Sequence, residues 1–395
     1  MRRETITMQP LRVLSSVTAA YSGEKIVQQL NRIKPLSQWP TTRWLTASPE
    51  EQGIDSAGIA AAVEACCSRN LHSFVLVRNG CLVAEGYSQA WDEEKLHPVY
   101  SIAKSFTSAV AGMAIDMGLL EGVDQRAGDF FPELAAKDVR KSEITIAQLL
   151  SMSSGLEWNN RGEQSSIEMA DAPDWLGYVL ERPMAEAPGT VFRYCNGNAH
   201  WMSGLLQQAI GIPVALYAEH KLLRPLGVRS FGWGADPQGI TIGSWALYLT
   251  ARDMAKFGLL YLQGGLWEGE ELVPRSWVEA SVQLRQRPAF RDGTQGGYGF
   301  NWWLKPISSD IPALVFYAAG SGGQRIFVVP EWNLVLATTG NNQRDDYMPE
   351  RLLAHMAAAV KSERALPENK KAAAKLSSAL ASFNKEVDKP ELCSL

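Results

Sequence analysis

The chain has 395 residues, of which 46% are hydrophobic and 20% are charged, and its formal net charge at pH 7 is −4. A chain of this length is too long for one ordinary hydrophobic core and suits two lobes. The small net charge excludes a strong field that would attract nucleic acid or an anionic membrane, so we expect neither partner.

The N-terminal part is expected to enter a sheet early. Residues 1–45 form an N-terminal extension with an irregular pattern. Residues 56–69 have helical spacing, and two short apolar runs follow at 72–77 and 81–87. An Asn-Gly pair separates these runs and is a strong signal for a tight β-hairpin turn.

A long helix and a mostly helical region follow the hairpin. Residues 101–120 are mainly small and apolar and contain no proline, which predicts a strong helix. Further helices are expected beyond residue 121, separated by Pro-Gly and Gly-rich joints. Their segments are 144–152, 174–180, 199–210, 213–223 and 251–262.

The C-terminal part returns to strands. β-rich runs occur at 313–317, 324–329 and 334–339, and a Pro-Glu-Trp-Asn turn joins the last two. A closing helix is expected at 349–364. A Lys-, Ala- and Ser-rich segment follows it and suits a helix and a mobile tail.

Strands at both ends with helices between them imply one sheet built from distant chain segments. We therefore expect an α+β fold, with an antiparallel sheet flanked by helices and an inserted, mostly helical region. The expected domains are an N-terminal extension at 1–45, a sheet domain made of 46–120 and 290–365, a mostly helical domain at 121–289, and a C-terminal tail at 366–395.

Signals for disulfides, metals and targeting are weak. The cysteine count is odd and no C-x-x-C motif occurs, which favours reduced structural thiols. The five histidines show no ligand spacing and are expected to be structural, and neither a metal nor a cofactor is expected. Polar residues interrupt 11–20, and no apolar run reaches membrane-spanning length, which predicts a cytoplasmic protein. The cysteines are Cys66, Cys67, Cys81, Cys195 and Cys393.

Ser101 and Lys104 form an S-x-x-K motif at the start of the long helix. Two chance matches begin at Ser22 and Ser382, but only Ser101 follows a predicted hairpin and opens an almost uncharged helix. Positions i and i+3 share a helix face, which places the Lys104 amine near the Ser101 hydroxyl. The helix N-terminus and burial both disfavour the ammonium, so a neutral amine can take the serine proton. The alternative is a capping serine beside a solvated lysine.

Tyr194, Cys195 and Asn196 form the only Y-x-N motif in the chain. A tyrosine here can share protons with lysine and serine, and an asparagine can donate its amide to a substrate carbonyl. Cys195 is expected to be a small spacer that points away from the cleft. The alternative interpretation is a loop tyrosine followed by a capping asparagine.

The order S-x-x-K, Y-x-N and then a Gly-rich segment near a late strand resembles the serine β-lactamase and penicillin-binding-protein superfamily. Segments at 144–156, 298–303 and 322–325 are also similar to it. The resemblance covers roughly residues 45–360. It is strongest to the class C-like branch, which holds family VIII esterases, D-amino-acid peptidases and amidases, and 6-aminohexanoate-oligomer hydrolases.

The third motif of that superfamily is K-T-G, or H-x-G in many relatives, and this chain has neither. The matching stretch is Ala318-Ala319-Gly320-Ser321. The resemblance implies that the missing cation or imidazole orients a substrate carboxylate, which argues against β-lactams and D-Ala-D-Ala peptides as substrates. Gly320 still lets the strand approach the substrate, and the implied oxyanion hole consists of the N–H groups of Ser101 and Ser321.

These motifs and the resemblance predict a serine hydrolase that cleaves a small ester or amide through an acyl-enzyme. Ser101 is the expected nucleophile, Lys104 and Tyr194 form the base system, and Asn196 positions the acyl side. The specific expectation is an esterase or a 6-aminohexanoate-dimer-hydrolase-like amidase. The alternatives are a β-lactamase or D,D-peptidase, and a catalytically silent binding protein on the same scaffold. The absence of G-x-S-x-G and H-E-x-x-H argues against an α/β-hydrolase and a zinc protease.

Overall fold

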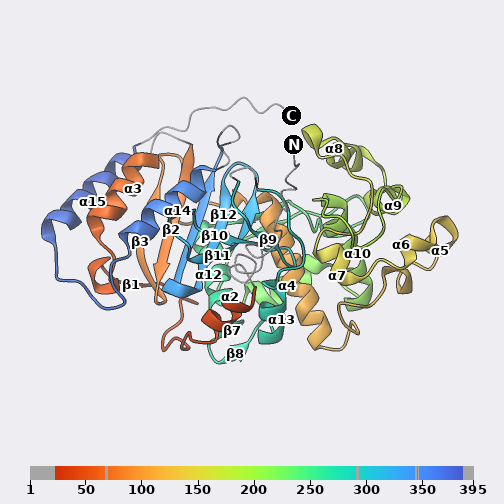
Figure 1. Ribbon diagram of the computed structural model, residues 1–395, viewed down its shortest axis with the longest axis horizontal. Helices are drawn as coiled ribbons and strands as arrows, with labels where there is room; N and C mark the ends of the chain where they lie inside the picture. Colours follow the sequence, from red (N-terminus) through yellow and green to blue (C-terminus); the bar gives the residue numbers. More distant parts are fainter. Residues whose placement is uncertain (1–22, 67–69, 291–292, 343–344, 346, 386–395) are drawn as a thin grey trace, which may run out of the picture.

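A computed structural model describes residues 23–66, 70–290, 293–342, 345 and 347–385 of the chain. Within these residues, one eight-stranded sheet forms the centre of the molecule (Figure 1). Its strands, in spatial order, are β1 Leu45–Thr46, β3 Cys81–Tyr87, β2 Leu71–Arg78, β13 Leu334–Gly340, β12 Gln324–Val329, β11 Leu314–Gly320, β10 Trp303–Pro306 and β9 Gly297–Tyr298.

The sheet joins the two ends of the chain, as the sequence predicts. β2 pairs with β13 in antiparallel register, and Leu76 lies opposite Leu336. The β2–β3 hairpin turns at Asn79 and Gly80, which both have positive φ angles, 52° and 78°, as a tight hairpin turn requires. The pairings are antiparallel except at one edge, where the short strand β1 runs parallel to β3. The α+β class is confirmed, and the sheet is mixed at this edge.

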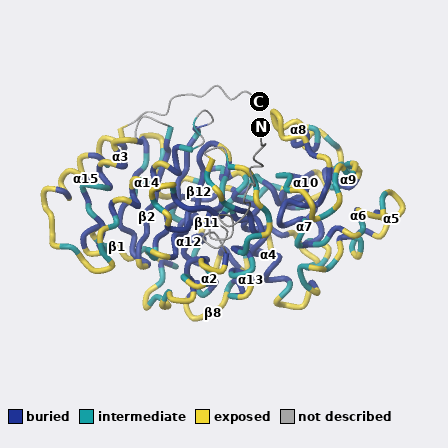
Figure 2. Tube along the Cα trace, in the orientation of Figure 1, coloured by how far each residue is buried: buried dark blue, intermediate teal, exposed yellow. Residues whose placement is uncertain are grey.

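The sheet separates two hydrophobic layers. Alternate residues of a strand face opposite sides, so Val75 belongs to one apolar cluster and Leu76 to the other. The Leu76 face is covered by α3 Ser56–Cys66, α14 Met348–Ala359 and α15 Lys370–Phe383. The Val75 face packs against α12 Ala251–Leu262 and α4 Ala103–Asp116. Figure 2 shows the buried segments concentrated between these layers.

A mostly helical region lies between α4 and α12 in the chain. Figure 1 shows α5, α6, α8 and α9 at the end of the molecule opposite α3 and α15. The helices are α5 Leu134–Lys137, α6 Val139–Ser142, α7 Ile146–Leu150, α8 Gln164–Asp171, α9 Trp175–Glu181, α10 Asn196–Ile210 and α11 Val214–Ala218, followed by a π-helical turn at Glu219–Leu223. α13 Arg275–Ser281 leads back towards the sheet.

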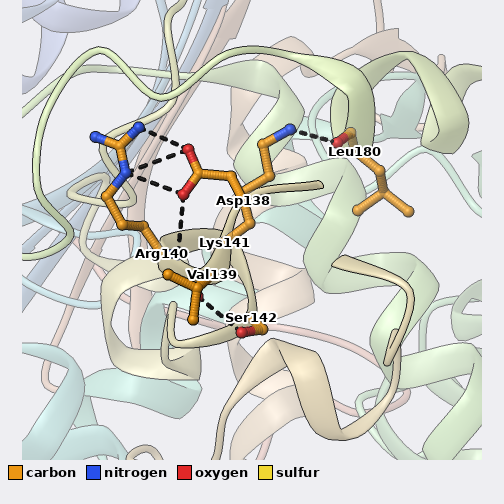
Figure 3. Close-up of polar contacts among 6 residues, drawn as sticks. All are labelled: Asp138, Val139, Arg140, Lys141, Ser142 and Leu180. Atoms are coloured by element: carbon orange, nitrogen blue, oxygen red, sulfur yellow. Dashed lines mark hydrogen bonds and ion pairs between the residues drawn. The ribbon is translucent and has the colours of Figure 1, made fainter. Parts of the chain in front are cut away.

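A hydrogen bond from a buried lysine joins helices α6 and α9 of this region (Figure 3). The Lys141 Nζ donates a 2.8 Å hydrogen bond to the carbonyl of Leu180, near the C-terminal end of α9. Asp138 caps α6 by accepting a hydrogen bond from the Arg140 backbone, and its carboxylate also pairs with the Arg140 guanidinium. The lysine thereby satisfies a carbonyl that has no partner within the helix.

Several predicted element boundaries differ from the observed ones. The extension at 1–45 is not irregular throughout, because Gly23–Leu30 forms helix α2, whose Ile26 and Leu30 are buried. The helix predicted at 101–120 spans Ala103–Asp116 and follows a 3₁₀ turn. The helix predicted at 349–364 ends at Ala359, because Val360 turns extended and bridges to Ile54.

The other predicted segments have these outcomes. The helix expected at 56–69 is observed to Cys66, and 67–69 lie outside the described residues. A helix in the C-terminal segment is confirmed as α15, while 386–395 lie outside the described residues. In the described part of the chain, no helix combines the length and apolarity needed to span a bilayer.

Candidate active site

Ser101 lies in a 3₁₀ turn, Tyr100–Ile102, directly before α4. The preceding strand β4 His97–Pro98 pairs with β6 Leu247–Leu249, and the Val99 N–H donates to the Leu247 carbonyl. Tyr100 has a φ of 49°, a conformation that non-glycine residues rarely adopt. Such a strained position is held by its surroundings and is frequent at functional sites.

The amine of Lys104 lies beside the Ser101 hydroxyl, at a distance of 2.9 Å. It also donates to the carbonyl of Ser244, at 2.9 Å, and the lysine is only 1% exposed. Burial lowers the pKa of Lys104 from 10.5 to about 7, while the charge of Glu163 acts in the opposite direction. An amine with this pKa is partly neutral at pH 7 and can then accept the serine proton.

The Tyr194 side chain completes this group. Its ring centroid lies 4.9 Å from the Lys104 Nζ, and the ring stacks against Trp303 with centroids 5.9 Å apart. Burial raises the pKa of the Tyr194 phenol, and a hydrogen bond with Ser101 opposes that rise. The phenol therefore stays protonated near neutral pH and can pass a proton between Ser101 and a leaving group.

Cys195 and Asn196 begin helix α10 and have other partners. The Cys195 thiol accepts a 3.3 Å hydrogen bond from the Asn198 N–H and so caps the helix. The Asn196 amide nitrogen donates to the Ser166 hydroxyl at 2.8 Å and to the Glu163 carboxylate at 3.4 Å. The amide predicted to hold a substrate carbonyl is thus already engaged by α8, and its role in positioning the acyl side stays a prediction.

Gly320 brings the end of β11 against the segment that precedes Ser101. A Cβ atom at this position would lie 2.2 Å from the Val99 carbonyl oxygen, so only glycine permits the approach. Ser321 follows Gly320 at the start of the turn to β12 and is exposed. The close contact between Gly320 and the Val99 carbonyl thus lies next to both residues of the expected oxyanion hole in the chain. Ser321 directly follows Gly320, and Ser101 follows Val99 by two residues.

The third-motif position has no cation. Ala318 is 1% exposed and belongs to the apolar cluster on the α4 side of the sheet. Arg325 on the neighbouring strand β12 is buried, and it donates to the Gly320 carbonyl while pairing with Glu350. Its guanidinium is therefore already engaged by the Gly320 carbonyl and by the Glu350 carboxylate.

Three groups at the site were not identified from the sequence. Glu163 comes from a segment without a motif, and it has a left-handed backbone (φ 56°) directly before α8. The Ser244 carbonyl is a backbone group, which a search for side-chain motifs cannot detect. Trp303 belongs to a segment similar to the superfamily, yet nothing in the sequence places it on Tyr194. The described residues contain no group of three or more His, Cys, Asp or Glu that could hold a metal ion.

Comparison with known proteins finds a matching family and similar proteins. Residues 53–360 match the protein family described as Beta-lactamase. The 6-aminohexanoate-dimer hydrolase of Paenarthrobacter ureafaciens is 24% identical over 251 residues, which cover 58% of this chain and 63% of that enzyme. The match thus spans less than two thirds of the length of this relative.

Solved structures share the fold. A Bacillus anthracis protein, provisionally named a 6-aminohexanoate-dimer hydrolase, superposes with a TM-score of 0.68 at 21% identity, covering 90% of this chain and 96% of that one. A family VIII carboxylesterase superposes with a TM-score of 0.63 at 17% identity, covering 80% of this chain and 99% of that one.

Proposed function

Because the chain belongs to the β-lactamase family, we propose that it is a serine hydrolase that cleaves a small ester or amide through an acyl-enzyme. The observation that carries the proposal is the buried Lys104 amine, 2.9 Å from the Ser101 hydroxyl, with a pKa lowered to about 7. A serine hydroxyl is a weak nucleophile until a neighbouring base takes its proton.

In the first half-reaction, the Ser101 Oγ attacks the substrate carbonyl carbon, and its proton moves to the Lys104 amine. The N–H groups of Ser101 and Ser321 stabilise the resulting oxyanion. The tetrahedral intermediate then collapses, the bond to the leaving group breaks, and the leaving group takes a proton from Lys104 by way of the Tyr194 phenol. An acyl-Ser101 ester remains.

In the second half-reaction, a water molecule attacks the acyl-Ser101 carbonyl and gives its proton to the same base system. The new tetrahedral intermediate expels the Ser101 oxygen, which recovers a proton from Lys104. The acid leaves and the free enzyme is restored. The reaction consumes one water molecule and needs neither a metal nor a redox cofactor, because Lys104 and Tyr194 carry every proton.

The preferred substrate is a small ester or amide that needs no cationic contact for a carboxylate. Ala318 offers no charge, and Arg325 is committed to Glu350 and Gly320. The Glu163 carboxylate adds negative charge near Lys104 and Tyr194, which disfavours an anionic substrate group there. The relative named 6-aminohexanoate-dimer hydrolase supports an amide of an amino acid as one candidate, and the family VIII carboxylesterase supports a simple ester.

The proposal is tested by labelling with a fluorophosphonate, together with turnover of p-nitrophenyl butyrate, 6-aminohexanoate dimer and nitrocefin. We expect one labelled residue, Ser101, identified by mass spectrometry, and hydrolysis of the ester or the amide dimer. Ser101→Ala should abolish both labelling and turnover without loss of fold. A wild-type protein that is neither labelled nor active on any of the three would instead be a silent binding protein, and nitrocefin as the best substrate would make it a β-lactamase.

A further inference from the structure

The turn between β11 and β12, residues 321–323, is held by two consecutive side chains of β12. Gln324 is fully buried, and its Nε2 donates to the Ser321 carbonyl at 2.6 Å and to the Gly340 carbonyl at 2.8 Å. Its Oε1 accepts from the Gly340 N–H at 2.8 Å. The Gln324 side chain therefore links the Ser321 carbonyl to Gly340 at the end of strand β13.

Arg325 fixes the preceding peptide. Its NH1 donates to the Gly320 carbonyl at 2.9 Å and to the Gln324 carbonyl at 3.0 Å, and its Nε donates to the Glu350 carboxylate at 2.9 Å. The two charged side chains are 7% and 9% exposed. A buried ion pair costs desolvation energy that apolar residues of similar size would avoid, so its placement here calls for a reason other than stability.

The geometry of the peptide bond supplies that reason. The Gly320 carbonyl and the Ser321 N–H belong to one planar trans peptide and point in opposite directions. A donor that anchors the carbonyl therefore also fixes the direction of the N–H. Donation to the carbonyl polarises the peptide and strengthens the N–H as a hydrogen-bond donor.

We propose that Arg325, held in place by Glu350, is a positioning residue that aims and polarises the Ser321 N–H for the oxyanion. The inference rests on the proposed function, because it requires that this N–H serve the acyl-transfer reaction. Arg325 acts through the backbone of the turn and makes no contact with the substrate. Glu350 lies in the first turn of α14, so this helix takes part in shaping the site.

The charge of Arg325 also reaches the catalytic group. It acts to lower the pKa of the Tyr194 phenol, against the larger effect of burial. A positive charge at this place favours any negative charge that develops between Tyr194 and the turn. Orientation and charge can be separated by substitution, since lysine keeps the charge but lacks the planar fork that reaches Glu350 and Gly320 together.

The test compares Arg325→Lys, Arg325→Met and Glu350→Gln with wild type in p-nitrophenyl butyrate hydrolysis and in inhibition by phenylboronic acid. A boronic acid bound to a catalytic serine mimics the tetrahedral intermediate, whereas the ester reports ground-state binding through KM. We expect kcat to fall roughly tenfold to hundredfold in Arg325→Lys, with KM within about twofold, because a misdirected oxyanion donor weakens only the transition state. The boronate Ki should rise by the same factor.

Arg252→Lys is the matched control, because Arg252 donates two N–H groups to Glu85 away from the turn. It should lower Tm without changing the boronate Ki. If Arg325→Lys and Glu350→Gln lower Tm but leave kcat and Ki at wild-type values, the pair is structural and the inference is wrong. If Arg325→Met does not fold, Arg325→Lys and Glu350→Gln still test the inference. Failure of the proposed function looks different: wild-type Ser101 would not be labelled at all.

Discussion

The Lys104 amine donates to the Ser101 hydroxyl and to the Ser244 carbonyl, and no carboxylate lies within hydrogen-bond distance of it among the described residues. A lysine paired with a carboxylate would remain an ammonium, whereas burial against neutral oxygens favours the free amine. We therefore expect activity to depend on the fraction of Lys104 that is deprotonated, and the first prediction follows from this.

The first prediction concerns pH. The neutral amine is the active form, and the pKa of Lys104 is lowered to about 7, so kcat/KM for p-nitrophenyl butyrate should rise as pH increases towards 7 and level off above it. The slope on the acid side should be roughly tenfold per pH unit, as for loss of one proton. The Glu163 charge favours the ammonium and raises this pKa, so Glu163→Gln should move the acid limb to lower pH.

Glu168→Gln provides the control for that shift. Glu168 lies on the same helix, α8, but its carboxylate accepts from the Tyr178 hydroxyl and from Gln164. Removing its charge should leave the acid limb where it is in wild type. A limb that Glu163→Gln does not move, or moves to higher pH, contradicts the assignment of the limb to Lys104.

The second prediction concerns the coupling of Lys104 and Tyr194. Lys104→Ala and Tyr194→Phe should each lower kcat by roughly 10² to 10⁴, because each removes a step of one proton path. The double variant should be little worse than the worse single variant, since residues that act as a unit are not additive. Phenylalanine keeps the ring that stacks on Trp303, so Tm should change little. Additive losses in ΔG‡ would instead separate the two residues into independent roles.

The third prediction concerns Cys195, which sits between two residues assigned to the site. Its thiol is 1% exposed, and burial raises its pKa to about 12. Because alkylation requires the thiolate, iodoacetamide should inactivate the protein only slowly. Cys195→Ser should keep ester turnover within about twofold of wild type, because a serine hydroxyl can cap α10 in place of the sulfur. Rapid inactivation that this substitution relieves would show a reactive thiol.

The sequence predicted those parts of the site that depend on local spacing. Ser101 and Lys104 are three residues apart, in a 3₁₀ turn and the first turn of α4, and the observed 2.9 Å contact agrees with that spacing. The two-residue hairpin turn, and one sheet that joins the two ends of the chain, followed from short local patterns, but the pairing of β2 with β13 did not. The catalytic roles of Ser101, Lys104 and Tyr194 stay predictions until the variants are measured.

The groups that the sequence did not reveal depend on tertiary contacts. Glu163 contacts Asn196 across 33 residues of chain, and residues 162 and 163 both have left-handed backbone conformations before α8. The Ser244 carbonyl comes to Lys104 from 140 residues away in the chain. The Arg325–Glu350 pair links β12 to α14, and Arg325 also donates to the backbone carbonyl of Gly320. No periodicity or motif encodes such contacts.

The last prediction concerns specificity. Wild type should hydrolyse short-chain p-nitrophenyl esters and show negligible turnover of nitrocefin and penicillins, since Ala318 cannot pair with a carboxylate. A charge-assisted contact is worth about 1.5–3 kcal/mol, so its absence should cost roughly one to two orders of magnitude against substrates that need it. Ala318→His or Ala318→Lys should raise nitrocefin turnover relative to ester turnover. Both should lower Tm, because the Ala318 side chain is buried in a packed layer.

Ala319 offers the control on the opposite face of the same strand. It packs against the cluster that contains α3 and α14, so Ala319→His places an imidazole away from Ser101. That variant should leave the ratio of nitrocefin to ester turnover unchanged, whatever its Tm. Gly320 and its contact with the Val99 carbonyl persist in all of these variants, so ester hydrolysis should survive. Nitrocefin turnover by wild type comparable with its ester turnover would contradict the prediction, because some other group would then be supplying the contact that Ala318 lacks.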